Sequence, residues 1–323
     1  MSTSSYILVV GGAGYIGSHM VLALQQAGYQ PLVYDNLSTG HAQAVLNAKL
    51  IVGELSDTRL LNQVFTTHDI QAVMHFASLI DVAESSQKPL KYYENNVGAT
   101  LNLFNVMLTH GVKPLIFSSS AAVYGQPLSV PILESHPLAP INPYGRSKWM
   151  VEEIIKDMAS NQGLHYSILR YFNAAGADPE GRLSEHHDPE SHLIPLILQV
   201  AAGLRDHIHV YGNDYATPDG TCIRDFIHVT DICQAHLLAL QALLQGHHNT
   251  VYNLGTSQGH SVLQVIHTAR ELTTHPIPIV HAPKRPGDPS VLVADATRAM
   301  QELQWRPKYP TLSTIIQHAW QKP

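Results

Sequence analysis

Tyr144 and Lys148 carry the first chemical signal in this chain of 323 residues. They lie four positions apart in the segment NPYGRSK, where Asn142 suits a helix N-cap and Pro143 the first helical turn. Both side chains then share one helix face. A tyrosine needs its pKa lowered by about 3 units to act as a base at neutral pH, and a nearby ammonium favours that shift. General-base chemistry is one interpretation; a half-buried tyrosine beside a solvated lysine is the other.

A serine-rich segment, FSSSAAVYG, begins at the end of an apolar run at Leu115–Phe117. This run is predicted to be the fifth strand of a parallel sheet, and ligands of such sheets bind beyond the carboxyl ends of the strands. A hydroxyl at Ser120 is therefore placed to relay a proton between a substrate and Tyr144. The alternative is that these serines only satisfy their own backbone.

A glycine-rich turn lies near the N-terminus, where residues 6–17 read YILVVGGAGYIG. Gly11 permits a tight turn, Gly14 lets the backbone approach a pyrophosphate, and Gly17 allows close helix–strand packing. Asp35 ends the next apolar run 18 residues later, where a carboxylate accepts from a ribose 2′-hydroxyl and repels a 2′-phosphate. The pattern predicts NAD as the cofactor. A purely structural turn, with Asp35 capping a loop, is the alternative.

The elements that must position these residues alternate along the first half of the chain. Six predicted strands cover Tyr6–Val10, Pro31–Tyr34, Leu50–Val52, Ala72–Phe76, Leu115–Phe117 and Tyr166–Arg170. Helical spacing covers Ile16–Ala27, Asp57–Thr67, Leu90–His110 and Tyr144–Asn161. Strict alternation predicts an α/β fold with a Rossmann-type, doubly wound parallel sheet.

The pattern loosens after Asn173 and predicts a smaller, mixed C-terminal substrate domain. We expect an NAD-binding domain over residues 1–173 and a substrate domain over 174–323, with the segment of about 225–254 packing back on the first. Later elements are predicted as helices at Ile194–Leu204, Asp231–Leu244 and from Ser261, and strands at Phe226–Val229 and Val251–Leu254.

Composition limits the classes of partner. Hydrophobic residues make up 45% of the chain, and its net charge is -6. The chain has no run of basic residues of the kind that binds nucleic acid. No apolar stretch reaches the roughly 18 residues that a membrane-spanning helix needs. Cys222 and Cys233 have no metal or CxxC spacing and are expected to be free thiols of a cytoplasmic protein.

One histidine-rich loop has residue types that bind metals. His186, His187 and His192 lie around Asp188 and Glu190, but without the helical spacing of known zinc motifs. We expect a solvated loop there and no metal.

Taken in order along the chain, the motifs resemble those of the extended short-chain dehydrogenase/reductase family, most closely its UDP-hexose 4-epimerase branch. The resemblance runs from residue 6 to about residue 320. It rests on GGAGYIGSH, YDNLSTG, HFAS, KPLKYYENN, FSSSAAVYG, PYGRSK, LRYFNAAGA, YGNDYATPDGT, RDFIHVTD and RPGDP.

The resemblance implies a redox-neutral reaction at C4 of UDP-galactose or UDP-glucose, through a transient 4-keto sugar, with NAD retained and recycled. By this match Tyr144 removes the 4-hydroxyl proton, Ser120 helps to transfer it, and Lys148 binds the nicotinamide ribose and lowers the tyrosine pKa. Family members also pair as homodimers, so a homodimer is expected.

The same match assigns binding residues. Those implied for the cofactor are Gly11, Gly14, Tyr15, Ile16, Gly17, Asp35, Asn36, Glu54, Leu55, Phe76, Ala77, Asn95, Ser118, Tyr144, Lys148 and Tyr171. Those implied for the UDP-sugar are Ser120, Asn173, His192, Leu193, Tyr211, Arg224, Arg285, Asp288 and Leu292. Arg224 and Arg285 suit a diphosphate as charge-assisted partners.

Some positions depart from the family pattern. Glu54 and Leu55 stand where many members have Asp-Ile, and Ile80 replaces a lysine near the cofactor, which weakens the expectation of tight NAD retention. Ala122 replaces a threonine beside Ser120, and His192 replaces an asparagine that binds phosphate in some members.

Leu292 stands where members confined to plain hexoses have tyrosine, and the smaller side chain motivates the hypothesis that UDP-N-acetylglucosamine is also accepted. Dehydration is disfavoured because Ala121 and Ala122 replace the acid–base pair it needs. UDP-glucuronate epimerisation, or another nucleotide-sugar reaction of the family, stays open. So does a non-catalytic NAD-binding sensor, which retention of Tyr144 and Lys148 disfavours.

Overall fold

A computed structural model describes residues 5–247, 249–285 and 287–320. Its contacts divide the chain into two compact units. The first lies within Met1–Val123, Pro140–Arg170 and Cys233–Tyr252, and the second within Tyr124–Ala139, Tyr171–Ile232 and Asn253–Pro323. The chain therefore enters each unit more than once.

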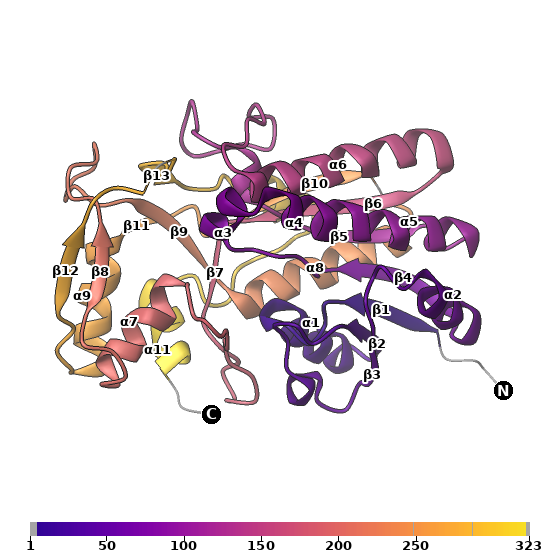
Figure 1. Ribbon diagram of the computed structural model, residues 1–323, viewed down its shortest axis with the longest axis horizontal. Coiled ribbons are helices and arrows are strands. Elements are labelled where there is room, and N and C mark those ends of the chain that lie inside the picture. The colour runs from indigo at the N-terminus through magenta and orange to yellow at the C-terminus, as the bar shows by residue number, and fades with distance from the viewer. Residues whose placement is uncertain (1–4, 248, 286, 321–323) are drawn as a thin grey trace. The chain divides into compact units, whose positions relative to one another are not determined.

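A seven-stranded parallel sheet organises the first unit, in the order β10-β6-β5-β4-β1-β2-β3 (Figure 1). Its strands are β1 (Tyr6–Val10), β2 (Gln30–Asp35), β3 (Lys49–Val52), β4 (Ile70–His75), β5 (Pro114–Ser120), β6 (His165–Tyr171) and β10 (Thr250–Leu254). β1 is buried on both faces, as apolar parallel strands require. The predicted Rossmann-type α/β fold is confirmed.

Helices of this unit follow the strands as βαβ crossovers demand. They are α1 (Tyr15–Gln26), α2 (Thr58–Thr67), α3 (Val82–Gln87), α4 (Pro89–Tyr93), α5 (Ala99–Thr109), α6 (Pro143–Gln162) and α8 (Val229–Leu244). Short 3₁₀ turns add η1 (Ala42–Val45) and η3 (Ala121–Val123).

The single helix predicted over Leu90–His110 is wrong in one respect. A π-helical turn, η2 (Glu94–Gly98), separates α4 from α5. Its cause lies outside the local pattern, because the buried side chain of Asn96 in this turn bonds to Leu79 and to Ser147 of α6. Such π turns often mark functional sites.

The second unit is smaller and mixed, as predicted. β9 (Ile223–His228) is central to a group with β7 (Asn173–Ala175), β11 (Gly259–Ser261) and β13 (Val291–Leu292). β8 (Ile208–Tyr211) pairs with β12 (Ile279–Ala282). Its helices are α7 (Leu193–Ala201), α9 (Val262–Thr273), α10 (Thr297–Glu302) and α11 (Leu312–Trp320).

This unit has a hydrophobic core of its own, in which side chains of α7, α9 and α11 pack together. Ser261 and Gln264 form the capping box that starts α9, at the position where the sequence predicted the helix to begin. Among the helices of the described residues, none is both long and apolar enough to cross a bilayer.

Candidate active site

Helix α6 begins at Pro143 because Asn142 caps it, accepting a 2.8 Å hydrogen bond from the amide of Gly145. The side chains of Tyr144 and Lys148 follow on one face, and both are buried. The helix start packs against η3, the turn that directly follows Ser120. The structure thus brings together the three residues that the sequence singled out for catalysis.

Ser120 ends β5 and faces the phenol of Tyr144. Burial raises the pKa of Tyr144, and a hydrogen bond with Ser120 lowers it in part. The serine oxygen also accepts the amide of Ala122 at 3.2 Å, which fixes its orientation. In the protein alone, burial therefore keeps the tyrosine protonated, and further positive charge is needed before it can accept a proton.

Lys148 is the buried positive group one helical turn beyond Tyr144. Its Nζ donates to the carbonyl of Ser118 at 2.9 Å and lies 5.2 Å from the centre of the Phe117 ring. Burial lowers the pKa of Lys148 to about 7, while the charge of Glu152 opposes that shift. The lysine can therefore exchange a proton near neutral pH.

Glu152 is a residue that the sequence analysis missed. It lies one turn beyond Lys148 on the same buried face, and it is completely buried. Its carboxylate accepts from Ser119 Oγ at 2.5 Å and from Arg170 Nε at 2.9 Å. The sequence did contain a signal for it, because Glu152 lies eight residues after Tyr144 and four after Lys148 and so shares their helix face.

His75 lies at the end of β4, in the HFAS motif. It is fully buried, and its Nε2 lies 2.9 Å from Thr100 Oγ1. Burial, with a smaller contribution from the charge of Lys148, lowers the pKa of His75 to about 3. This imidazole is therefore neutral and contributes packing and a hydrogen bond, not a proton.

The predicted glycine turn joins β1 to α1. Gly11 has a positive φ of 79°, and a Cβ there would overlap the backbone of Ala77. A Cβ at Gly17 would overlap the Gly11 carbonyl, whereas a Cβ at Gly14 would lie 3.5 Å from that same oxygen, at ordinary contact distance. Space is thus left open at Gly14, where α1 begins without any side-chain cap. An anion fits such a helix start.

Asp35 ends β2 with its carboxylate buried. One oxygen accepts from the amide of Ala13 within the glycine turn at 2.9 Å, and the other from Leu37 at 2.8 Å. Each carboxylate oxygen can still accept a second donor, such as a ribose hydroxyl. Asn36 donates to both oxygens of Glu54 at 3.1 Å, so these two predicted residues lie beside Asp35 and each other.

The other predicted cofactor residues lie on several elements. Phe76 and Ala77 follow β4 and donate to the carbonyl of Val10 at 2.8 and 3.1 Å. Asn95 lies in the π turn, and Ile80 is exposed. Leu55 packs against the core, Ile16 lies in α1, and Tyr171 ends β6 at the start of the second unit.

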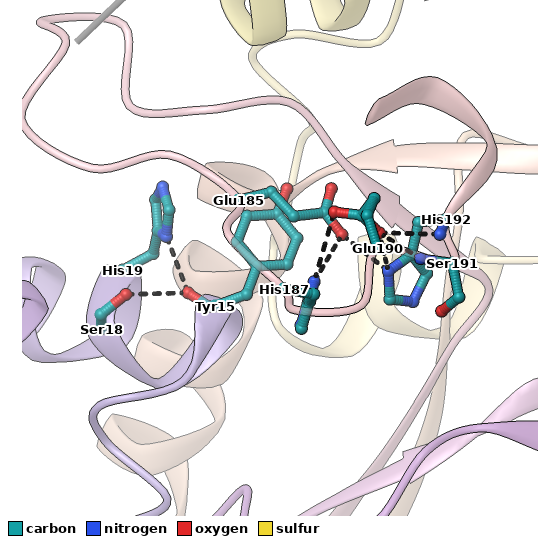
Figure 2. Close-up of polar contacts among 8 residues, drawn as sticks. All are labelled: Tyr15, Ser18, His19, Glu185, His187, Glu190, Ser191 and His192. Atoms are coloured by element: carbon teal, nitrogen blue, oxygen red, sulfur yellow. Dashed lines mark hydrogen bonds and ion pairs between the residues drawn. The ribbon is translucent and has the colours of Figure 1, made fainter. Parts of the chain in front are cut away.

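Tyr15 begins α1, and its carbonyl oxygen lies 3.0 Å from Ser18 Oγ and 2.8 Å from His19 Nδ1 (Figure 2). The Tyr15 and His19 rings also meet edge to face, with centroids 5.3 Å apart. These contacts fix the first turn of the helix that follows the glycine turn.

Apart from Ser120, the predicted substrate residues belong to the second unit. Arg224 on β9 pairs with Asp288, and Leu292 on β13 lies next to Arg224 in the strand register. Arg285 stacks 3.9 Å over the ring of Tyr211. Asn173 starts β7, while His192 and Leu193 stand at the start of α7.

The expectation of a solvated loop holds for His186 and Asp188, which are exposed, but it is wrong for Glu190. The side chains of Glu185 and Glu190 are only 6% and 4% exposed and face the rings of His187 and His192. Burial opposes protonation of the rings, but the two carboxylates outweigh it and raise the pKa of His187 to about 9 and that of His192 to about 10.

Together, a glycine turn on a Rossmann-type sheet and a buried serine–tyrosine–lysine set define an enzyme of the short-chain dehydrogenase/reductase type. The chain belongs to the NAD dependent epimerase/dehydratase family, whose model matches residues 7–255. The resemblance drawn from the motifs is confirmed.

Curated and solved relatives are similar over nearly the whole chain. A UDP-glucose 4-epimerase of Halalkalibacterium halodurans is 51% identical over 97% of this chain and 94% of its own length. The structure of the Brucella ovis UDP-glucose 4-epimerase in complex with NAD matches with a TM-score of 0.95 at 46% identity, covering 98% and 97% of the two chains. The UDP-Glc/GlcNAc 4-epimerase of Campylobacter jejuni matches with a TM-score of 0.86 at 42% identity, covering 98% of each.

Proposed function

We propose that this protein is an isomerase that inverts the configuration at C4 of UDP-galactose and UDP-glucose, using NAD without net redox change. The observation that carries the proposal is the buried contact of Ser120 with Tyr144, with Lys148 one helical turn away. The relatives named above are UDP-glucose 4-epimerases, which supports the same reaction here.

In this reaction Tyr144 takes the proton of the sugar 4-hydroxyl and later returns it to the C4 oxygen. Ser120 holds that oxygen and shortens the proton path. Lys148, anchored on Ser118, supplies positive charge that stabilises the phenolate. Neither Ala121 nor Ala122 offers an acid or base, so the C4 ketone would be reduced again and would not proceed to dehydration.

Bound NAD supplies the oxidant that accepts and returns the hydrogen of C4. The residues fit such a group, because Gly11 and Gly17 allow the turn to close while Gly14 leaves space at the start of α1. Asp35 would meet the adenosine ribose. We assign the remaining contacts to Tyr15, Ile16, Asn36, Glu54, Leu55, Phe76, Ala77, Asn95, Ser118 and Tyr171.

On the substrate side, we assign the diphosphate to Arg224 and Arg285. Arg224 is held by Asp288, so its guanidinium is oriented before a ligand arrives. Arg285 is held by stacking on Tyr211. We assign the other contacts with the UDP-sugar to Asn173, His192, Leu193 and Leu292.

A further substrate class follows from Leu292. This side chain lies beside Arg224 and is smaller than a tyrosine, which leaves room for a 2-acetamido group. The similarity to an enzyme named for both UDP-Glc and UDP-GlcNAc supports activity on N-acetylated UDP-sugars.

The experiment that tests the main proposal follows the conversion of UDP-galactose to UDP-glucose by the purified protein without added NAD. Conversion is expected, and Tyr144→Phe should lower kcat by about 100-fold or more, because the variant lacks the acid–base group. The variant should still bind NAD. No conversion by the wild type with NAD bound, or full activity of Tyr144→Phe, would favour a non-catalytic NAD-binding sensor.

We also propose a homodimer formed through α5 and α6. Leu101 on α5 and Trp149 and Met150 on α6 are exposed apolar side chains of these helices. Light scattering should give twice the chain mass of 35.5 kDa. Met150→Arg should shift the protein to the single-chain mass, whereas Leu128→Arg, at an exposed loop position, should not. A wild-type mass of one chain would exclude the dimer.

A cytoplasmic location is proposed because Cys222 and Cys233 are both free thiols. Secreted proteins more often pair such residues as disulfides.

A further inference from the structure

The loop that precedes α7 gathers two carboxylates and two imidazoles around one point (Figure 2). The side chains are those of Glu185, His187, Glu190 and His192. One ligand-type atom from each lies within 4.8 Å of all the others. All four belong to the second unit, and none transfers a proton in the proposed reaction. His192, which is assigned above to the UDP-sugar, faces this point with Nδ1 and keeps Nε2 for that contact.

Four nitrogen–oxygen separations in the cluster, which involve both oxygens of Glu190, lie near those of ligands around one tetrahedral ion. The Nδ1 atom of His192 lies 2.9 Å from Glu185 Oε1 and 3.2 Å from Glu190 Oε1. The Nδ1 atom of His187 lies 3.4 Å from Glu185 Oε1 and 3.7 Å from Glu190 Oε2. Ligands bound at about 2.0–2.1 Å in a tetrahedron are separated by about 3.3 Å, and the four distances fall on both sides of that value.

Glu185 provides a second, independent observation. Its side chain is 6% exposed, and its Oε1 atom is buried without a hydrogen-bond partner among the described residues. Its contacts with His192 Nδ1 at 2.9 Å and His187 Nδ1 at 3.4 Å are ion pairs that lack the direction of a hydrogen bond, and a metal ion would take the place of the two ring protons. Two ligand atoms of one metal ion are close together in this way, because their lone pairs point to the ion and not to each other. A buried carboxylate oxygen left without a donor is otherwise costly.

Two backbone amides orient the carboxylate of Glu190. Its Oε1 accepts from the amides of Ser191 and His192, both at 2.8 Å. His192 is the N-cap residue of α7, and its side chain makes no capping hydrogen bond. The ring is turned toward the carboxylates instead. An ion at this point would therefore tie the loop to the start of α7.

We propose that Glu185, His187, Glu190 and His192 form a four-coordinate site for a divalent transition-metal ion, for which zinc fits best. Two imidazole nitrogens and two carboxylate oxygens are a ligand set that zinc accepts, and two carboxylates neutralise its charge. Because the protein fills all four positions, the site is structural and leaves no open position for chemistry. Its role is to fix the loop between Glu185 and His192.

The test measures zinc bound to the protein rather than its epimerase activity. Untagged protein is dialysed against EDTA, then against buffer, and titrated with zinc chloride in equilibrium dialysis. About one zinc per chain is expected. His187→Ala and Glu185→Gln should each weaken binding at least about tenfold, since each removes a direct ligand. His186→Ala is the matched control, because His186 lies in the same loop outside the four ligands.

Two further readouts protect the test against a misfolded variant. Zinc should raise the melting temperature of the wild type and of His186→Ala, but not that of His187→Ala. Cobalt(II) added to the wild type should give the intense visible bands of a tetrahedral site. Zinc uptake that is unchanged by His187→Ala and Glu185→Gln would overturn the proposal. Binding of less than one zinc per two chains by the wild type would also overturn it. The four side chains would then form only histidine–carboxylate ion pairs.

Discussion

Arg170 of β6 donates from Nε to Glu152 of α6 at 2.9 Å, and both side chains are buried. The pair lies one turn beyond Lys148 on the helix face that carries Tyr144. Ser119, the neighbour of Ser120, donates to the same carboxylate at 2.5 Å. The ion pair therefore joins β6 to β5 and α6, the two elements that carry the reacting side chains.

Glu152→Gln should remove the charge while keeping an oxygen that accepts from Ser119. Leaving the buried guanidinium of Arg170 without its counter-ion should lower the free energy of unfolding by about 3–5 kcal/mol. Denaturant unfolding measures this. Glu153→Gln is the control, because Glu153 is half exposed and pairs with Lys156 at the surface, where about 1 kcal/mol or less is expected. Equal effects of the two variants would contradict the importance of the buried pair.

The pKa of Lys148, lowered by burial from 10.5 to about 7, predicts a pH-dependent stability. Between these values the unfolded chain holds a proton that the folded chain has lost, so the free energy of unfolding rises with pH. Relative to Lys148→Met, the NAD-free wild type should gain up to about 1.4 kcal/mol per pH unit from pH 7 to 9. Urea unfolding at several pH values tests this, with Lys156→Met as an exposed control. Parallel curves for wild type and Lys148→Met would disprove it.

Ser120→Ala should shift the pH dependence of the reaction. The hydrogen bond from Ser120 lowers the pKa of Tyr144, so its loss raises that pKa. The basic form of the tyrosine is then reached only at higher pH. The rising limb of kcat/KM against pH should therefore shift to higher pH. A variant whose activity falls without any movement of this limb would show that Ser120 holds the substrate and does not tune the tyrosine.

Gly14→Ala and Gly17→Ala should separate cofactor binding from folding. A methyl group at Gly17 overlaps the Gly11 carbonyl, so this variant should lose about 1–3 kcal/mol of stability. A methyl group at Gly14 has room in the protein alone and should leave unfolding of the NAD-free chain nearly unchanged. It should instead weaken NAD binding by at least about tenfold, since about 1.4 kcal/mol of lost contact has that effect. Tight NAD binding by Gly14→Ala would argue against the assigned position of the pyrophosphate.

Leu292→Tyr should change substrate preference. The larger ring should lower kcat/KM for UDP-N-acetylglucosamine by about tenfold or more relative to UDP-glucose. Leu292→Met, which conserves volume, is the control and should keep the wild-type ratio. If the ratio of the two activities is the same in Leu292→Tyr and the wild type, this position does not form the wall of the sugar site.

Ile80 lies where the proposed NAD site has no charged side chain. It is exposed and cannot donate a hydrogen bond, so it offers a bound dinucleotide only apolar contact. The carboxylate of Asp35 and the amides at the start of α1 must then supply most of the polar contacts by which this unit holds NAD.

Local chemistry explains what could be predicted. Apolar runs and 3.6-residue spacing depend on neighbours a few positions away, so the strands of the sheet and most helices were expected within a few residues. The start of α6 followed from Asn142 and Pro143, and the shared face of Tyr144 and Lys148 followed from that start. Short strands such as β11 and β13 were missed because two or three residues carry no period.

The sequence alone therefore determined the parallel sheet, the glycine turn with Asp35, and the spacing that places Tyr144 and Lys148 on one face. Only the tertiary structure decided that Glu152 is buried against Arg170, that a π turn interrupts the helix at Asn96, and that Glu185 and Glu190 are buried beside two histidines. The reason is physical. A periodic pattern reports which face of a segment is apolar, whereas the burial and pairing of a charge depend on residues that folding brings to it from elsewhere in the chain.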